Sequence, residues 1–298
     1  MRRLLASLLL IGALLSGCAA GPVTGMANVE GGPAQELKVP ARELEYRLEL
    51  ETFQDVAHAD SGEALASYRV KIPVMTVWTQ EGEPMEKPKT DAERAALAAA
   101  EAFNLEFSTW SSGEHFEQAA ADAQTSLDIR KEEGADWFDG YSMELTCAVY
   151  ETDRIVSVYG PCYSYTGGAH PNTVMMSWNF DLESGTFFNG ELLAADRPSF
   201  RQQVEEELLR QIQERPDTDG MSAAELLWPE YETILKDWTS YTVFFDETGM
   251  TVAFSPYELA PYAAGEQIFT MPYDWLESRL GQHGCELLGL PGTSETES

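Results

Sequence analysis

Residues 156–185, VSVYGPCYSYTGGAHPNTVMMSWNFDLESG, contain the pattern on which the fold of this protein depends. β-Branched and aromatic residues are frequent on both sides of a central loop, as is typical of strands. The loop contains two glycines and a proline, which are residue types that turn a chain sharply. The stretch therefore predicts two strands joined by a sharp bend, which would place Tyr163, Tyr165 and His170 side by side.

Strand and helix patterns flank this stretch on both sides. Alternating apolar residues predict two strands at 44–50 and 68–76, and Thr90 with Glu93 resembles a capping box ahead of a helix. Helices are predicted at 91–107, 114–133, 198–214 and 222–238, strands at 141–152, 154–160 and 173–188, and a hairpin turned at 248–249. Helices placed between antiparallel hairpins predict an α+β fold, with antiparallel or mixed sheets, packed helices and two subdomains.

The first 17 residues have the layout of a secretory signal peptide. Two arginines precede an apolar run from Leu4 to Leu15, which is shorter than the roughly 20 residues of a membrane-spanning helix. The sequence LSGC that follows resembles a bacterial lipobox, in which Cys18 is lipidated and becomes the mature N-terminus. Ordinary secretion with a free Cys18 thiol is the alternative. We expect an extracytoplasmic, membrane-anchored lipoprotein whose residues 18–40 form a flexible linker.

The chain is strongly acidic, with 19 Lys and Arg against 50 Asp and Glu and a formal net charge of −31. This charge argues against binding to nucleic acid or to anionic lipid surfaces, because both attract basic patches. It favours basic partners or cations, although a solvated acidic surface also keeps an exported protein soluble. Hydrophobic residues make up 44% of the chain, which is enough for a sizeable core.

Three cysteines follow Cys18, and export would place them where disulfides can form. Cys147 and Cys162 lie on neighbouring predicted strands, so a disulfide between them and two reduced, buried thiols are both open. With Cys285 the number is odd, which leaves at least one thiol unpaired. No Cys-x-x-Cys or His-x-x-x-His spacing supports a zinc site, and we predict neither a metal nor a cofactor.

Three motifs follow one another in the second half of the chain. They are Tyr-x-Tyr-x-Gly-Gly-Ala-His at 163–170, Asn-Phe-Asp-Leu-x-x-Gly at 179–185 and Pro-Tyr-x-x-Ala-Pro-Tyr-Ala-x-Gly at 256–265. In this order they resemble the extracytoplasmic domain of unknown function found in RsiV-type anti-sigma factors and PdaC-type peptidoglycan deacetylases. The resemblance implies an α+β domain at 141–280, preceded by a PdaC-like N-terminal α+β subdomain at 41–140.

The resemblance covers only the accessory part of both architectures. RsiV-type proteins carry a sigma-binding segment and a membrane span ahead of this domain, and here 17 residues precede Cys18. PdaC-type enzymes carry a catalytic domain after it, and here the polar residues 281–298 predict only a disordered tail. We therefore expect no anti-sigma role and no separate deacetylase domain. Lysozyme recognition, known for some family members, is carried over as an expectation.

His170 has three open roles: a structural histidine that bonds the loop backbone, a ligand-binding residue, or a general base. Gly167 and Gly168 permit positive φ and close backbone approach, and Pro171 fixes φ just before Asn172. The chain has no Gly-x-Ser-x-Gly elbow, which argues against a serine-based triad, and we predict no catalytic residue.

Tyr257 and Tyr262 lie beside prolines and form a stiff aromatic segment that suits stacking on sugars or packing against a partner. Covering an edge of the core is the alternative role. The predicted ligand-binding residues are Tyr163, Tyr165, Gly167, Gly168, His170, Asn172, Tyr257 and Tyr262.

These observations predict a lipid-anchored, non-catalytic cell-envelope protein that recognises cell-wall glycan or a basic wall-active protein such as lysozyme. A cell-wall-modifying hydrolase or deacetylase that uses His170 is the alternative. A purely structural envelope lipoprotein without a ligand is the third possibility.

Overall fold

The computed structural model describes residues 44–79, 81–135, 137–218 and 220–292. Contacts group residues 42–298 into one compact unit. The predicted signal peptide, Cys18 and the predicted linker, like every residue before the first strand, lie outside the described residues. Within the described ranges, none of the helices is both long enough and apolar enough to cross a membrane.

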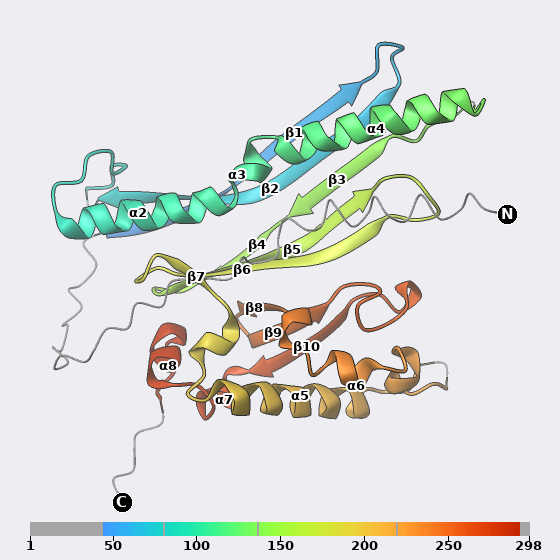
Figure 1. The fold of residues 1–298 in the computed structure, drawn as a ribbon. Helices are drawn as coiled ribbons and strands as arrows, with labels where there is room; N and C mark the ends of the chain where they lie inside the picture. The colour runs from blue at the N-terminus through green and yellow to red at the C-terminus, as the bar shows by residue number, and fades with distance from the viewer. Residues whose placement is uncertain (1–43, 80, 136, 219, 293–298) are drawn as a thin grey trace, which may run out of the picture. The chain divides into compact units, whose positions relative to one another are not determined.

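A seven-stranded mixed sheet, called the first sheet, is at the centre of Figure 1. Its order is β1-β2-β3-β5-β6-β7, and β4 also pairs with β5. The strands are β1 Leu44–His58, β2 Ala64–Thr79, β3 Tyr141–Thr146, β4 Ala148–Glu151, β5 Ile155–Tyr165, β6 Asn172–Asp181 and β7 Thr186–Phe188. The predicted hairpin at the N-terminal end and the pair of strands around the glycine loop are both present.

One pairing in the first sheet is parallel. β2 runs alongside β3 with Ala66 opposite Tyr141, whereas the other neighbouring strands are antiparallel. The helices α2 (Asp91–Glu106), α3 (Ser108–Ser111) and α4 (Glu114–Glu132) form the connection between these two strands. The predicted subdomain boundary between residues 140 and 141 thus falls inside this sheet, because β2 precedes it and β3 follows it.

Helices α2 to α4 lie over one face of the first sheet (Figure 1). α2 begins at the predicted capping box, in which the Thr90 side chain accepts from the Glu93 N–H and the Glu93 carboxylate accepts from the Thr90 N–H. Its buried face carries Phe103, which is fully buried and packs against Phe180 of β6 with ring centroids 5.3 Å apart. Burial of this face against the strands stabilises an alanine-rich helix that has only a narrow apolar stripe.

A second, three-stranded antiparallel sheet lies on the other side of the first sheet (Figure 1). It has the order β10-β9-β8, with β8 Thr242–Asp246, β9 Gly249–Phe254 and β10 Gln267–Pro272. Every residue of β9 is buried, as expected for a strand covered on both faces. Helix α5 (Arg197–Glu214) packs on this sheet, and α7 (Tyr273–Glu277) follows β10.

A buried polar network, called the inter-sheet network, joins the two sheets. The hydroxyl of Ser157 donates to Asn179 Oδ1 at 2.8 Å and accepts from the backbone N–H of Phe245 at 2.8 Å. Asn179 Nδ2 donates to the Val243 carbonyl at 2.8 Å. Because these groups are shielded from water, each contact satisfies a donor or acceptor that would otherwise be costly to bury. The network therefore sets the position of β8 relative to β5 and β6.

Two predictions of local structure are wrong. The predicted helix at 222–238 is broken into the short segments η2 (Ala223–Leu226), α6 (Tyr231–Ile234) and η3 (Trp238–Ser240). Pro229 lacks a backbone N–H and disfavours helical conformation in the residue before it, and the Trp228 N–H donates instead to the Leu259 carbonyl at 3.0 Å.

The second error concerns the predicted disordered tail from residue 281. Residues Gln282–Leu288 form helix α8, in which Cys285, Leu287 and Leu288 are buried in the core below the second sheet. Gly284 lets this helix pack closely, because a Cβ there would lie 2.2 Å from the carbonyl oxygen of Leu193. Residues 293–298 lie outside the described ranges.

Candidate functional site

Two segments that are distant in sequence meet at one end of the first sheet. One is the glycine loop, residues 166–171, between β5 and β6; the other is the proline segment, residues 255–262, which follows β9. The buried Ser255 hydroxyl accepts from the Met175 N–H of β6 at 3.0 Å, and this bond ties the proline segment to the strand that follows the glycine loop.

Tyr257 occupies an unusual backbone conformation. Its φ is 75°, which makes it the one residue other than glycine with positive φ among the described residues. A bulky residue in this region costs of order 1–3 kcal/mol and persists only where its surroundings impose it. Here the Tyr257 N–H donates to the Ala260 carbonyl at 3.0 Å, and Trp228 Nε1 donates to the Tyr257 carbonyl at 3.1 Å.

The result is a cluster of three rings, called the His–Tyr cluster: His170, Tyr257 and Tyr262. His170 Nδ1 lies 2.8 Å from the Pro171 carbonyl and Nε2 lies 3.0 Å from the Tyr257 hydroxyl. Since a carbonyl only accepts, these contacts assign the proton to Nδ1, so that the tyrosine donates to Nε2. The Tyr262 ring stacks on His170 with centroids 4.1 Å apart and an interplanar angle of 20°.

The cluster faces solvent. Tyr257 is 49% exposed, His170 is exposed, and Tyr262 is half-buried. Its members present ring faces that suit stacking and a hydroxyl that suits hydrogen bonding. His170 Nε2 is already engaged by Tyr257, so a role as general base would require the tyrosine hydroxyl to leave it.

The other predicted residues of the glycine loop make different contacts. The Tyr165 hydroxyl lies 3.1 Å from the Gly168 carbonyl and 3.3 Å from Oδ2 of Asp139, which shortly precedes β3. Partial desolvation and then the Asp139 carboxylate raise the pKa of Tyr165. Tyr163 shares the Tyr165 face of β5, two residues earlier, and no ring contact or hydrogen bond joins it to His170 in the described part of the chain.

The backbone of Gly167 and Gly168 can be compared with the two roles expected of these glycines. Gly167 and Gly168 have φ of 88° and 113°, which confirms the predicted need for positive φ. A Cβ at either position would meet no atom of the described chain within 4 Å, so close approach of a ligand to this backbone stays a prediction. Asn172 lies opposite Ser164 and begins β6, at the edge of the loop.

Sequence reasoning missed the residues that hold Tyr257 in place. Trp228 belongs to a stretch that looked helical, and its indole only reaches Tyr257 after the helix breaks at Pro229. Glu258 accepts from the Ser255 N–H at 2.5 Å, and burial of its carboxyl group raises the pKa of Glu258 although part of the residue is exposed. A tryptophan directly before a proline was the one signal in the sequence for this contact.

Cys147 lies between β3 and β4 and is 2% exposed, while Cys162 lies on β5 opposite Leu145. Burial, and then the nearby Cys162, raises the pKa of Cys147 to about 12. A thiol with such a pKa stays protonated at neutral pH and reacts slowly. The alternatives of a disulfide between these residues and two buried thiols stay open as predictions.

Comparison with known proteins finds one family on this chain. The family described as "Protein of unknown function (DUF3298)" matches residues 191–274, a range that contains Tyr257 and Tyr262 and excludes the glycine loop. No curated protein matches the chain.

Solved structures of the same family resemble the chain. A DUF3298 family member from Bacteroides fragilis has a TM-score of 0.57 and 13% identity, and the likeness covers 83% of this chain and 98% of that one. A DUF3298 family protein from Pseudomonas aeruginosa PAO1 has a TM-score of 0.42 and 17% identity over 84% of this chain and 98% of that one. The first likeness shows a shared fold alone. Residues 191–274 of this chain therefore match the DUF3298 family, whose function is unknown.

Proposed function

We propose that this protein is a lipid-anchored, non-catalytic binding protein of the cell envelope. Its recognition surface is the His–Tyr cluster together with the glycine loop, and its ligand is cell-wall glycan or a basic wall-active protein such as lysozyme. The resemblance to the extracytoplasmic domain of RsiV-type and PdaC-type proteins, which rests on the three motifs described above, supports this proposal.

The exposed, strained Tyr257 is the observation on which the proposal rests. Three residues hold its backbone and ring, at a cost in free energy, while 49% of its surface stays in contact with water. A tyrosine that only covered the core would be buried and would not need positive φ. Strain of this kind is concentrated at ligand-binding and catalytic sites.

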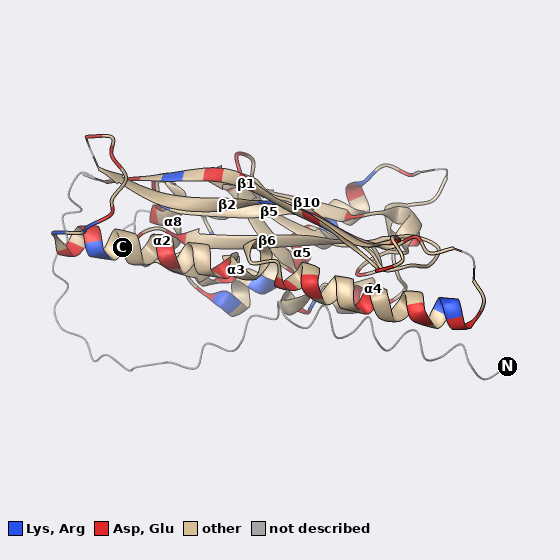
Figure 2. Cartoon of the chain, turned by 90° about the horizontal axis from the view of Figure 1, so that it is seen from above, with Lys and Arg blue, Asp and Glu red and all other residues tan. Residues whose placement is uncertain are grey.

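The charge of the chain favours a basic partner. Figure 2 shows Asp and Glu positions spaced along α2 and α4, with few Lys and Arg positions between them. A surface of this sign attracts a basic protein over distances of about a Debye length, roughly 8 Å at physiological salt. The aromatic cluster would then supply the specific, short-range contacts.

A binding assay with residues 19–298 tests the proposal, because residues 42–298 form a compact unit by themselves. Lysozyme and purified peptidoglycan are each applied at low salt and at about 0.15 M salt, where exposed charges are screened. Specific binding persists at the higher salt. Binding that disappears there reports charge attraction alone and contradicts the proposal.

Tyr257→Asn is the variant of choice, because asparagine tolerates positive φ and lacks the ring with its hydroxyl. We expect affinity to fall at least about tenfold, as for an aromatic residue at the centre of an interface. The matched control is Ile268→Ala, which removes an apolar side chain that is 43% exposed on β10, outside the cluster. Equal affinity of wild type and Tyr257→Asn, or product release from peptidoglycan that His170→Ala abolishes, would contradict the proposal.

The anchor is tested separately. Two acyl chains on Cys18 each contribute about 0.8 kcal/mol per buried methylene, which is enough for stable attachment to a membrane. Cys18→Ser should move the protein from the membrane fraction to the soluble fraction and leave its unfolding transition unchanged. Wild-type protein found free in the medium with an unmodified N-terminus would overturn the anchor.

A further inference from the structure

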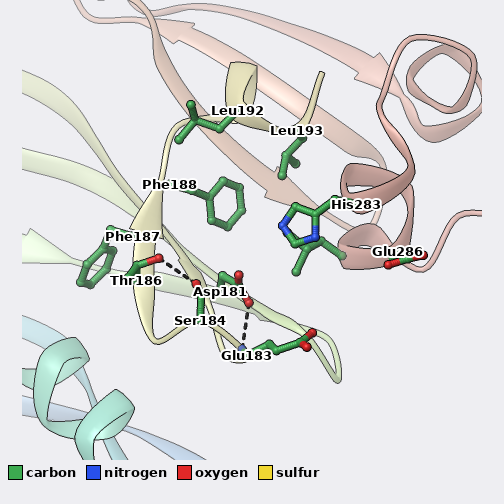
Figure 3. Close-up of a pocket in the computed structure, with 11 residues that line it drawn as sticks. Asp181, Glu183, Ser184, Thr186, Phe187, Phe188, Leu192, Leu193, His283 and Glu286 are labelled. Atoms are coloured by element: carbon green, nitrogen blue, oxygen red, sulfur yellow. Dashed lines mark hydrogen bonds between the residues drawn. The ribbon is translucent and has the colours of Figure 1, made fainter. Parts of the chain in front are cut away.

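A pocket of about 410 Å³ lies at the opposite end of β6 from the glycine loop. β6 begins at Asn172 beside that loop and ends at Asp181, which lines the pocket, and ten residues of strand extend over about 30 Å. The pocket is open to solvent and is lined by the turn between β6 and β7, by η1 (Gly190–Leu193) and by α8 (Figure 3). It is therefore separate from the His–Tyr cluster.

The apolar walls of the pocket are held in place by the fold. Phe188 of β7 and Leu192 of η1 line the pocket (Figure 3), and Leu287 of α8 also belongs to its lining. The close contact of Gly284 with the Leu193 carbonyl fixes α8 against η1. The volume falls within the range of about 300–1,000 Å³ that is typical of small-molecule sites, most of which are largely preformed.

The carboxylate of Asp181 provides the polar group. Asp181 is 4% exposed, and its Oδ1 accepts from the Glu183 N–H at 2.8 Å. Figure 3 shows this carboxylate between the Glu183 turn and the rings of Phe188 and His283. Among the described residues, no Lys or Arg forms an ion pair with it and no donor reaches its second oxygen. Its second oxygen can therefore accept a hydrogen bond from a ligand in the pocket.

The remaining polar residues of the pocket are two acids, Glu183 and Glu286, together with Ser184, Thr186 and His283. Glu183 and Glu286 lie at its rim, and Arg154 is 3.8 Å from Glu183 in an exposed ion pair. The three carboxylates of the lining thus favour a cationic ligand over an anionic one, and the apolar walls disfavour a hydrated metal ion.

We propose that this pocket binds a small organic ammonium compound with a flat apolar body. The ammonium group donates to the free side of the Asp181 carboxylate in a charge-assisted hydrogen bond, and the apolar body packs against Phe188, Leu192 and Leu287. The proposal is independent of the function proposed for the His–Tyr cluster.

Calorimetric titration of residues 19–298 with tryptamine tests the proposal. Two comparison compounds test the ammonium group and the apolar body separately. Indole-3-propionate has the same ring and the opposite charge, and putrescine has ammonium groups without a flat apolar body. We expect tryptamine to bind and both comparison compounds to bind at least about tenfold more weakly. Absence of binding at about 1 mM tryptamine, or equal binding of indole-3-propionate, overturns the proposal.

Asp181→Asn locates the site, because the amide oxygen still accepts from the Glu183 N–H while the charge is lost. Tryptamine affinity should fall about tenfold or more, and Asp217→Asn, which neutralises an exposed acid outside the pocket, should leave it unchanged. If Asp181→Asn does not fold, Leu192→Trp at the 42% exposed wall residue should block binding instead. Unchanged affinity in a folded variant overturns the proposal, whereas Tyr257→Asn should bind tryptamine like wild type whatever its effect on wall ligands.

Discussion

The inter-sheet network and the His–Tyr cluster link the same parts of the chain in different surroundings. Both connect β5, β6 or the loop between them to the stretch from β8 to the proline segment. In the network, Ser157 and Asn179 are 0% and 6% exposed, whereas Tyr257 in the cluster is 49% exposed. Water cannot replace a lost partner in the first case and can in the second. The same kind of hydrogen bond therefore supports stability in one place and is available for recognition in the other.

Asn179→Ala should have the largest effect on stability. It leaves the Val243 carbonyl and the Ser157 hydroxyl without their partners in a dry interior, and we expect a loss of about 3 kcal/mol in the free energy of unfolding. Urea denaturation measures it. Asn172→Ala at the start of β6, which removes the same side chain from a partly exposed position, should cost less than about 0.5 kcal/mol. Similar losses in the free energy of unfolding for both variants would contradict the claim that buried contacts contribute more to stability than exposed ones.

Ser157→Ala should follow, with a loss of about 2 kcal/mol, because the Phe245 N–H loses its acceptor. The double variant with Asn179→Ala should lose less than the sum of the single variants, since the two side chains share one hydrogen bond. Additive losses in the same denaturation assay would show that the network does not act as a unit.

Variants of the His–Tyr cluster should affect stability less than either change in the network. Tyr257→Gly relieves the positive φ and loses ring contacts, so we expect a net change within about 1 kcal/mol. His170→Ala should cost no more than about 0.5 kcal/mol, because both its contacts are exposed to solvent. Thermal unfolding checks both, and a loss for His170→Ala as large as that for Asn179→Ala would make the cluster part of the structural core.

The smallest effect should be a pH dependence of the free energy of unfolding that comes from Glu258 in the proline segment. Burial raises the pKa of Glu258 above its ordinary value of 4.5, so the folded state holds this proton more tightly than the unfolded state does. The stability that protonated Glu258 contributes is fully present below pH 4.5 and is lost as pH rises through the pKa of the folded state. Glu258→Gln should remove this decline. Denaturation midpoints of both proteins, measured across this range, test the direction, and a wild-type stability that rises relative to the variant would contradict it.

Local features of the fold follow directly from the sequence. The capping box at Thr90, the helix after it and the alternating pattern of the first hairpin involve neighbouring residues, and the structure contains each of them. The failures have local explanations too. The residues at 222–238 have a helical composition, but Pro229 interrupts the helix. The stretch 281–298 is polar on average, although three of its side chains, Cys285, Leu287 and Leu288, are buried in α8.

The sequence by itself determined the periodicity of the strands, the class of the fold, the positive φ of Gly167 and Gly168, and the position of the loop that bears His170, because these depend on preferences of a few adjacent residues. Only the tertiary structure decided that β3 pairs with β2 in parallel across three helices, and that His170 meets Tyr257, which is 87 residues away. Such pairings depend on which distant surfaces exclude water together, and no local pattern encodes that choice.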